Sequence, residues 1–332
     1  MIECIFTVDY EIYGNGEGSL KELVYEPAEK LLTVFREWKA RFVPFVEVAE
    51  LEMIEAEGRD STIDLVKHQI QEFYRDGFEI GLHLHPQWYK AQYENGRWLL
   101  DYSEYNLCTL REQRIAQILD RSIAYLRGLI GVPDFTPLSF RAGNWLFHPA
   151  ETLAEVLASK GIKIDSSVFK GGVRHSHNLD YRPALKNGCF WRFQRNASMP
   201  DSGGSLIEVP IYAKMVPFWK MLSSKRVALE RDNLVAAPSS CHRLNRLFDY
   251  LRLSHPLKLD FCRMSGDELI AMVDEVVEED KKSPASYRPL VAIGHTKELV
   301  DFDAINFFLS YLKQKEIEVS TFEEVYPKCI CD

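Results

Sequence analysis

Short apolar segments alternate with amphipathic segments along most of the chain. The uninterrupted apolar segments predict buried strands, whereas apolar residues that recur every three or four positions predict helices. Strands that are separated by helices need crossover connections, so neighbouring strands are expected to be parallel. The pattern therefore predicts an α/β protein built around a parallel sheet.

The predicted strands are IECIFTVD (2–9), FVPFVEV (42–48), FEIGLHLH (78–85), LSFRAG (138–143), IKIDSSV (162–168), LIEVPIY (206–212), PLVAIGH (289–295) and IEVS (317–320). The predicted helices are 27–39, 62–76, 109–130, 149–160, 240–253, 265–280 and 303–315. Capping boxes place two of the helix starts, one with Thr109 and Glu112 and the other with Ser265 and Glu268. Asp303 is expected to cap the helix near the C-terminus.

Two segments lack a clear period. Residues 89–107 are polar and aromatic, and we expect a long loop at the mouth of a site. Residues 169–204 are irregular, with one strand or hairpin arm at CFWRFQR (189–195), and residues 215–260 are mixed apart from the helix predicted at 240–253. We therefore expect a single domain over residues 1–332 with an insertion around 169–262.

Polar residues follow the predicted strands at their carboxyl ends. An open doubly wound sheet and a closed barrel both fit the strand pattern, but barrel enzymes build their sites from such strand ends. This placement favours the barrel. The residues concerned are Asp9, Glu11, His83, His85, Arg141, Asp165 and His295.

The overall composition is that of an ordinary globular protein. Among 332 residues, 46% are hydrophobic and 27% charged, which is enough apolar material for a large core. The net charge of −9 argues against a nucleic-acid backbone or an anionic membrane surface as the main partner. We see neither a signal peptide nor an apolar run that could span a bilayer, and the seven scattered cysteines suggest reduced thiols. A cytoplasmic protein is expected.

The spacing of two between His83 and His85 places both imidazoles on one side of a strand. Asp9 and Glu11 have the same spacing at the end of the first strand. Two imidazoles with one or two carboxylates can hold a divalent ion such as zinc, although a polar strand end is the simpler explanation for either pair alone. A nearby carboxylate could act as a base and a separate histidine as an acid. His295 is the candidate acid, and a hydrogen-bonded core histidine is the alternative.

Arg141 and Asp165 have two interpretations each. Arg141 can orient a carboxylate or bind substrate, and a structural ion pair is nearly as plausible. Asp165 most simply caps the loop that follows it, and the alternative is that it orients Arg141 or His295.

The chain resembles the polysaccharide deacetylases (NodB-homology domain, carbohydrate esterase family 4). The motifs that carry the resemblance occur in the family's order and are FTVDYE, EIGLHLHPQW, SFRAGNW, IDSSV and IGHTKE. The resemblance implies a distorted (β/α)7 barrel that removes an N-acetyl or O-acetyl group from a carbohydrate with the help of a divalent metal.

The resemblance also implies roles for single residues. Asp9 matches the catalytic base, His83 a metal ligand, Arg141 the residue that supports the base, and His295 the general acid. The chain departs from the family at two places, because Tyr10 and Glu11 follow Asp9 where the family has a second aspartate, and Gln87 stands where it has its second histidine. By strand geometry, Glu11 and His85 are the expected ligands beside His83.

Two other functions are compatible with the sequence. A non-catalytic barrel could bind a glycan through aromatic loop residues, and we expect Trp88, Asn144 and Trp145 to contact substrate or glycan in either case. Tyr89, Tyr93, Trp98 and Trp191 are further stacking candidates. A glycoside hydrolase of a related barrel could use Asp9 and Glu11 as its two carboxylates, which lie about 7 Å apart at this spacing.

Overall fold

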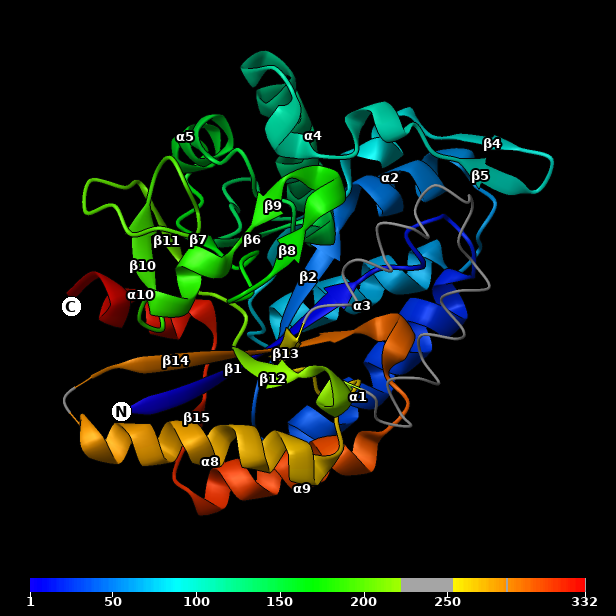
Figure 1. The fold of residues 1–332 in the computed structure, drawn as a ribbon. Coiled ribbons are helices and arrows are strands. Elements are labelled where there is room, and N and C mark those ends of the chain that lie inside the picture. The colour runs from blue at the N-terminus through cyan, green and yellow to red at the C-terminus, as the bar shows by residue number, and fades with distance from the viewer. Residues whose placement is uncertain (222–252, 285, 332) are drawn as a thin grey trace.

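The computed structural model describes residues 1–221, 253–284 and 286–331, and a curled, mostly parallel sheet forms its centre (Figure 1). The strand order is β10-β11-β7-β6-β3-β2-β1-β14, and β15 also pairs with β1. These strands are β1 (Ile2–Tyr10), β2 (Val43–Glu47), β3 (Gly81–Leu84), β6 (Ser139–Ala142), β7 (Ile164–Asp165), β10 (Trp191–Phe193), β11 (Leu206–Glu208), β14 (Arg288–His295) and β15 (Glu318–Val319). Smaller antiparallel pairs are β4 (Gln92–Glu94) with β5 (Arg97–Leu99), β8 (Val173–Arg174) with β9 (Leu179–Asp180), and β12 (Ala213–Pro217) with β13 (Ser254–Lys258).

Strand β1 lies between two parallel neighbours. It pairs with β14 over its whole length, and this register places Asp9 opposite His295. On its other side the carboxyl half of β1 pairs with β2, and the amino half pairs with β15. The ends of the first and last long strands are therefore side by side, although they are far apart in the sequence.

The curled sheet closes into a ring through isolated bridges. Ile211 bridges to Val291 and Asp260 bridges to Ile293, both on β14. The backbone N–H groups of Tyr212 and Phe261 donate to the carbonyl oxygens of Val291 and Ile293, each at 3.0 Å. This closure confirms the predicted distorted (β/α)7 barrel, and the irregular seam between β11 and β14 is the source of the distortion.

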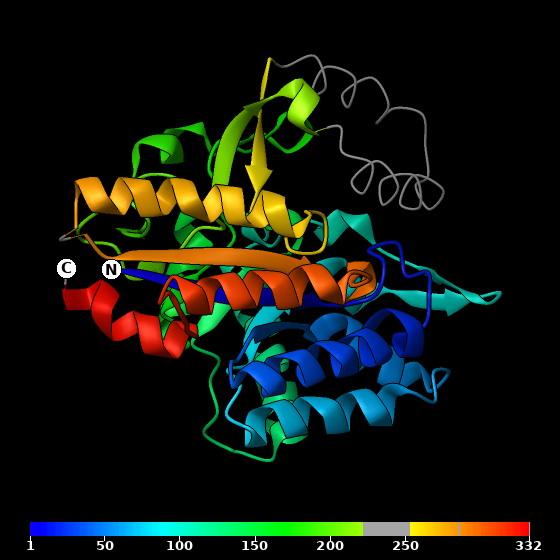
Figure 2. The ribbon, with the colours of Figure 1, turned by 90° about the horizontal axis from the view of Figure 1, so that it is seen from below.

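Helices cover the outside of the barrel (Figure 1). Their bounds are α1 (Glu26–Trp38), α2 (Val48–Glu57), α3 (Ile63–Arg75), α4 (Glu112–Ile130), α5 (Glu151–Ser159), α8 (Gly266–Lys282), α9 (Phe302–Gln314) and α10 (Phe322–Cys331). Figure 2 shows α8 and α9 running side by side along β14, with the N- and C-terminal ends at one end of the molecule. No helix in the described ranges is both long and apolar enough to cross a membrane.

Several predicted elements need correction. Helix α2 was not predicted, although its buried residues Val48, Leu51 and Ile54 have helical spacing, and α10 was also not predicted. The expected loop over 89–107 contains the β4–β5 hairpin. The helix predicted at 240–253 falls almost wholly outside the described residues. The single domain with an insertion around 169–262 stays a prediction.

Only one of the two predicted capping boxes forms. Ser265 and Glu268 make the reciprocal bonds of a capping box at the start of α8. Thr109 instead donates its hydroxyl to the carbonyl oxygen of Asn106, and α4 begins after Arg111 without a side-chain cap. The cap of α9 is Asp301 rather than Asp303, because Asp301 lies just before the first helical residue and accepts from the Ala304 N–H.

Because Ser265 caps α8 and Thr109 does not cap α4, substitution of these two exposed residues should lower the free energy of unfolding by different amounts. Ser265→Ala should lower the free energy of unfolding by about 1 kcal/mol, because the first turn of α8 loses its cap. The matched Thr109→Ala should change it by less than about 0.5 kcal/mol, as is usual for surface positions without a special role. Urea denaturation of both variants measures the two costs. Equal losses in the free energy of unfolding would contradict the assignment of the caps.

Candidate active site

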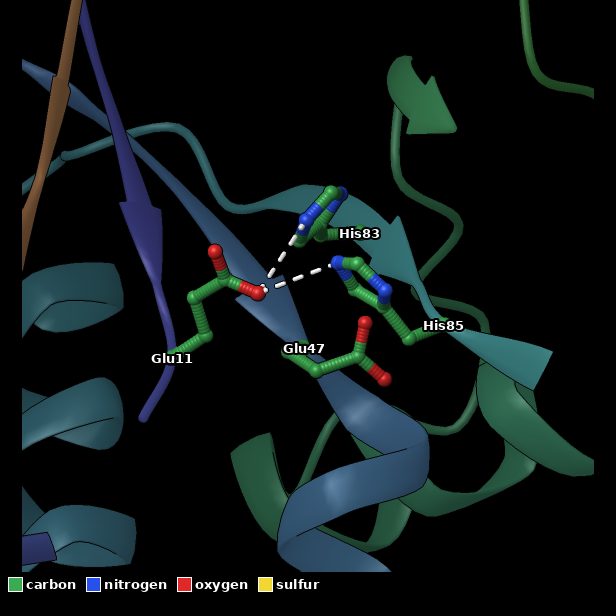
Figure 3. A group of neighbouring side chains, drawn as sticks. All are labelled: Glu11, Glu47, His83 and His85. Atoms are coloured by element: carbon green, nitrogen blue, oxygen red, sulfur yellow. Dashed lines mark ion pairs between the residues drawn. The ribbon is translucent and has the colours of Figure 1, made fainter. Parts of the chain in front are cut away.

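Two histidines and a glutamate meet at the carboxyl ends of β3 and β1 (Figure 3). His83 and His85 lie on the same side, and their ring centroids are 4.9 Å apart. The Oε2 atom of Glu11 lies 3.5 Å from Nε2 of His83 and 3.1 Å from Nε2 of His85. All three side chains are buried. The structure thus brings together the three residues that were predicted as metal ligands.

A backbone contact sets the tautomer of His83. Its Nδ1 lies 2.9 Å from the carbonyl oxygen of Arg141, which can only accept a hydrogen bond. In the neutral ring the proton is therefore on Nδ1, and the lone pair of Nε2 faces Glu11. A metal-binding histidine is typically held in this way by a bond from its other nitrogen.

Three neighbours hold His85 in place. Its Nδ1 lies 3.2 Å from the side-chain amide of Gln87 and 3.3 Å from that of Asn144. Both amides present their nitrogen to Nδ1, which therefore accepts, so the proton of the neutral ring is on Nε2 and faces Oε2 of Glu11 at 3.1 Å. A metal ion at this position would take the place of that proton. The ring packs so closely on Gly143 that a Cβ there would lie 2.9 Å from Nδ1. Gln87, which replaces the family's second histidine, thus contacts His85.

A fourth buried side chain, Glu47, points toward this group and was not selected from the sequence (Figure 3). The ligand atoms of Glu11, Glu47, His83 and His85 all lie within 4.8 Å of one another, and we call these residues the histidine–glutamate group. Burial raises the pKa of Glu47 to about 8. Glu47 could have been selected from the sequence because it lies between a predicted strand and an amphipathic segment. That segment was not recognised as a helix.

Lys297 anchors the other oxygen of Glu11. Its Nζ donates to Oε1 of Glu11 at 2.8 Å and to the carbonyl oxygen of Ile12 at 2.9 Å. Burial raises the pKa of Glu11, but the charges of Lys297 and His85 outweigh burial and hold this pKa well below its usual range. Glu11 is therefore an ionised carboxylate with Oε2 turned toward the histidines. Lys297 lies in the motif IGHTKE, yet nothing in the sequence alone indicated this contact.

The histidine–glutamate group fits a zinc-type divalent ion. A tetrahedral ion with bonds of about 2.0–2.1 Å to nitrogen and oxygen holds its ligand atoms about 3.3–3.4 Å apart. The distances of 3.5 and 3.1 Å from Oε2 of Glu11 to the two histidines are close to that value. Burial lowers the pKa of His83, but Asp9 and Glu11 raise it to about 9, so the carboxylates favour positive charge here.

Asp9 is held between an arginine and a histidine. Its Oδ1 accepts from Nη1 of Arg141 at 2.6 Å, and its Oδ2 lies 3.4 Å from Nε2 of His295. Burial raises the pKa of Asp9, but the charges of Arg141, His83 and His295 bring it below its usual value. The structure therefore brings together three of the four predicted catalytic residues, next to the histidine–glutamate group.

His295 has an acidic neighbour on its other side. Its Nδ1 lies 3.7 Å from Oε2 of Glu298 and makes no hydrogen bond within the described ranges. Burial raises the pKa of Glu298, but hydrogen bonds from Arg263 and the charge of His295 lower it to about 2. Burial lowers the pKa of His295 itself, so the ring is neutral near pH 7.

Asp165, the fourth predicted catalytic residue, turns to its own loop. It accepts from the Ser167 hydroxyl at 2.6 Å and from the Ser167 N–H at 3.2 Å, which is the loop cap that was the simpler prediction. It also shares a side-chain hydrogen bond with the buried Glu208. Burial raises the pKa of Asp165, and the charge of Arg141 acts to lower it. Within the described ranges, however, the hydrogen bonds of Arg141 go to Asp9, Thr7 and Ser166, and the catalytic role of Asp165 stays a prediction.

The three predicted substrate-binding residues differ in their exposure. Trp88 is only 1% exposed and packs on Trp98 with ring centroids 5.2 Å apart, so its ring is part of the core and offers no stacking face. Asn144 and Trp145 are half-buried, and both have left-handed backbones with φ of 56° and 59°. Strained residues of this kind concentrate at functional sites. Trp145 lies against His295, with Lys258 over its ring at 3.4 Å from the centroid.

The comparisons with known proteins identify the fold. No family model and no curated protein matches the chain. Among solved structures, a protein described as a polysaccharide deacetylase from Mycobacterium smegmatis matches with a TM-score of 0.55 at 15% identity, over 99% of this chain and 90% of that one. PuuE allantoinase matches with a TM-score of 0.52 at 12% identity, over 98% and 88%. A polysaccharide deacetylase from Pseudomonas aeruginosa matches with a TM-score of 0.50 at 10% identity, over 98% and 89%.

These likenesses establish the class of fold. The chain has the polysaccharide deacetylase fold over nearly its whole described length. At identities of 10–15% the likeness shows the fold alone, so the activity has to be argued from the side chains.

The carboxyl pair of Asp165 and Glu208 predicts a pH-dependent stability. Burial raises the pKa of Asp165 to about 6 and that of Glu208 well above its usual value. The folded state therefore retains protons that the unfolded state releases above about pH 4, and stability falls as the pH rises through about 6. Glu208→Gln keeps the acceptor for the Val168 N–H and supplies an N–H to Asp165. It should raise the free energy of unfolding at pH 8 by about 1–3 kcal/mol, the usual cost of a buried polar group without a partner.

Urea denaturation at pH 5 and pH 8 measures this effect, with Glu155→Gln on the exposed face of α5 as the control for the lost charge. Glu208→Gln should raise the free energy of unfolding by less at pH 5, because the folded wild type still retains its protons there. A loss of stability at pH 8 would contradict the prediction.

Proposed function

We propose that the protein is a metal-dependent hydrolase that removes an acetyl group from a carbohydrate. The observation that carries this proposal is the convergence of two sets of side chains at one end of the barrel. The ligand atoms of Asp9, Glu11 and His295 lie within 4.8 Å of one another, and Glu11 also belongs to the histidine–glutamate group. Asp9 as a base, His295 as an acid and the histidine–glutamate group as a place for a cation would therefore lie around the same point. Hydrolysis of an amide or ester requires such an arrangement.

Glu11, His83 and His85 would hold the ion, which we propose to be zinc. When bound, such an ion supplies a Lewis acid for the acetyl carbonyl and lowers the pKa of a coordinated water. Lys297 keeps Glu11 oriented through Oε1, and the carbonyl oxygen of Arg141 keeps His83 oriented through Nδ1.

Asp9 and His295 would move the proton. Arg141 holds Oδ1 of Asp9, so Oδ2 is the atom that can take a proton from the attacking water. Nε2 of His295 is 3.4 Å from Oδ2, and because its ring is neutral it must gain a proton before it can protonate the leaving group. The proton that Asp9 removes has a short path to this ring.

Two observations support a carbohydrate as the substrate, namely the similar solved structures and an aromatic side chain beside the proposed acid. Two of the similar structures are described as polysaccharide deacetylases, and Trp145 beside His295 offers an aromatic ring next to the proposed acid. We also propose a cytoplasmic location and no nucleic-acid partner, in line with the charge of −9. Because an allantoinase has the same fold, hydrolysis of allantoin is a second candidate reaction.

The double substitution of His83 and His85 by alanine should abolish both bound zinc and deacetylase activity. The exposed His68 on α3 provides the control, and His68→Ala should keep both properties. Zinc content is measured by elemental analysis, and acetate release is measured from acetylated oligosaccharides, with allantoin assayed in parallel. Activity that persists in the double variant would overturn the proposed metal dependence.

The same measurements separate an enzyme from a glycan-binding barrel. Asp9→Asn removes the proposed base but no proposed metal ligand, so it should keep zinc and lose acetate release by about 100-fold or more, the usual contribution of a general base. A wild-type protein that binds glycan but neither holds zinc nor releases acetate would favour the binding barrel.

A further inference from the structure

We infer that Glu47 is a fourth protein ligand of the metal ion, which makes a site of two imidazoles and two carboxylates and leaves a fifth position for water, as five-coordinate zinc allows. This inference rests on the proposed function, because it concerns the same metal site. It goes beyond the ligand set of Glu11, His83 and His85, which was expected from strand spacing. Three independent features of Glu47 support it.

The first feature is an oxygen atom without a partner. The side chain of Glu47 is fully buried, and Oε2 makes no hydrogen bond of normal geometry within the part of the chain that the structure describes, although burial raises the pKa of this carboxyl and the backbone N–H of His85 is near enough to act to lower it. A buried carboxylate oxygen without a partner is costly. Its ligand atom lies within 4.8 Å of those of Glu11, His83 and His85, so a metal ion in this group would be the missing partner.

The second feature is that strand pairing fixes the backbone of Glu47 and hydrogen bonds fix one of its carboxylate oxygens. Glu47 is the last residue of β2 and pairs in register with His83 of β3. Its Oε1 accepts from the backbone N–H groups of Ala49 at 3.1 Å and Glu50 at 3.3 Å, which makes it the N-cap of α2. The cap fixes one oxygen and leaves Oε2 for another bond, as Lys297 does for Glu11.

The third feature is the balance of charges. The other carboxylates of the site each have a cationic side chain, namely Lys297 for Glu11, Arg141 for Asp9 and Arg263 for Glu298. Glu47 forms no ion pair with any residue in the described ranges, where its neighbours are Glu11 and the two histidines. Burial alone disfavours the ionised form of Glu47. Because a buried carboxylate is stable only when it is paired or binds a metal, a divalent ion would supply the counter-charge that this form lacks.

The experiment compares Glu47→Gln with Glu50→Gln. Glu50 in the first turn of α2 is the control, because it is also buried and also has an unpartnered Oε2, yet it lies outside the histidine–glutamate group. Its Oε1 accepts from the Ile12 N–H, and the amide oxygen of Gln can keep that bond. Glu47→Gln keeps an amide oxygen to cap α2, and Glu47→Ser, which substitutes another residue favoured as an N-cap, is the second variant if the first fails to fold. Circular dichroism and thermal melting check the fold of each variant.

Zinc affinity is measured by competition with a chromophoric chelator, and the coordination of Co²⁺ is measured from its visible spectrum. Glu47→Gln should weaken zinc binding by more than about 100-fold, because loss of an outer-shell partner alone costs about 10–100-fold. It should also change the Co²⁺ bands. Glu50→Gln should match the wild type in both measurements.

The outcomes separate this inference from the proposed function. If folded Glu47→Gln binds zinc and Co²⁺ as the wild type does, Glu47 is not a ligand, while the proposed metal dependence stands. Loss of activity with unchanged zinc affinity would instead make Glu47 a base and would also overturn the inference. If the wild type binds no stoichiometric zinc, both proposals fail.

Discussion

The buried guanidinium of Arg141 is the interaction on which the rest of the site depends. Its three nitrogens bond to Asp9, Thr7 and Ser166, and its plane lies over the ring of Phe45 at 4.2 Å. These partners belong to β1, to β2 and to the segment just after β7, so one side chain connects several strands. A fully buried charge requires such complete pairing, and the strand ends must meet around it. The orientation of Asp9 follows directly from this arrangement.

The site has two halves that are built differently. The half with the histidine–glutamate group lies on β1, β2 and β3, which are regular strands in continuous parallel register. The half around His295 lies between β14 and the irregular segments that close the barrel at Ile211 and Asp260. Asp9 belongs to both halves through the pairing of β1 with β14. The histidine–glutamate group and the surroundings of His295 are therefore supported by different parts of the chain.

The sequence predicted most of the fold and part of the site. Asp9, Glu11, His83 and His85 could be found because side chains alternate along a strand, so a spacing of two puts each pair on one face.

Glu47 was missed because its position depends on the turn from β2 directly into α2, and the residues of α2 were not recognised as a helix. Lys297 was missed because its contact with Glu11 joins residues 286 positions apart. Caps were predicted from residue type, but α4 begins after Arg111 and α9 begins after Asp301, so neither Thr109 nor Asp303 occupies the capping position. Trp88 was expected to contact substrate because no local pattern indicates that Trp98 packs against it.

The irregular closure of the barrel has a consequence for how the protein can vary. Strands in register tolerate few insertions, because a shift by one residue turns every side chain to the opposite face. The seam between β11 and β14 depends on isolated bridges, so added or lost residues around it leave the alternation of β1, β2 and β3 undisturbed. The seam can therefore change in length among descendants of this chain, while the strands that hold the histidine–glutamate group keep their register.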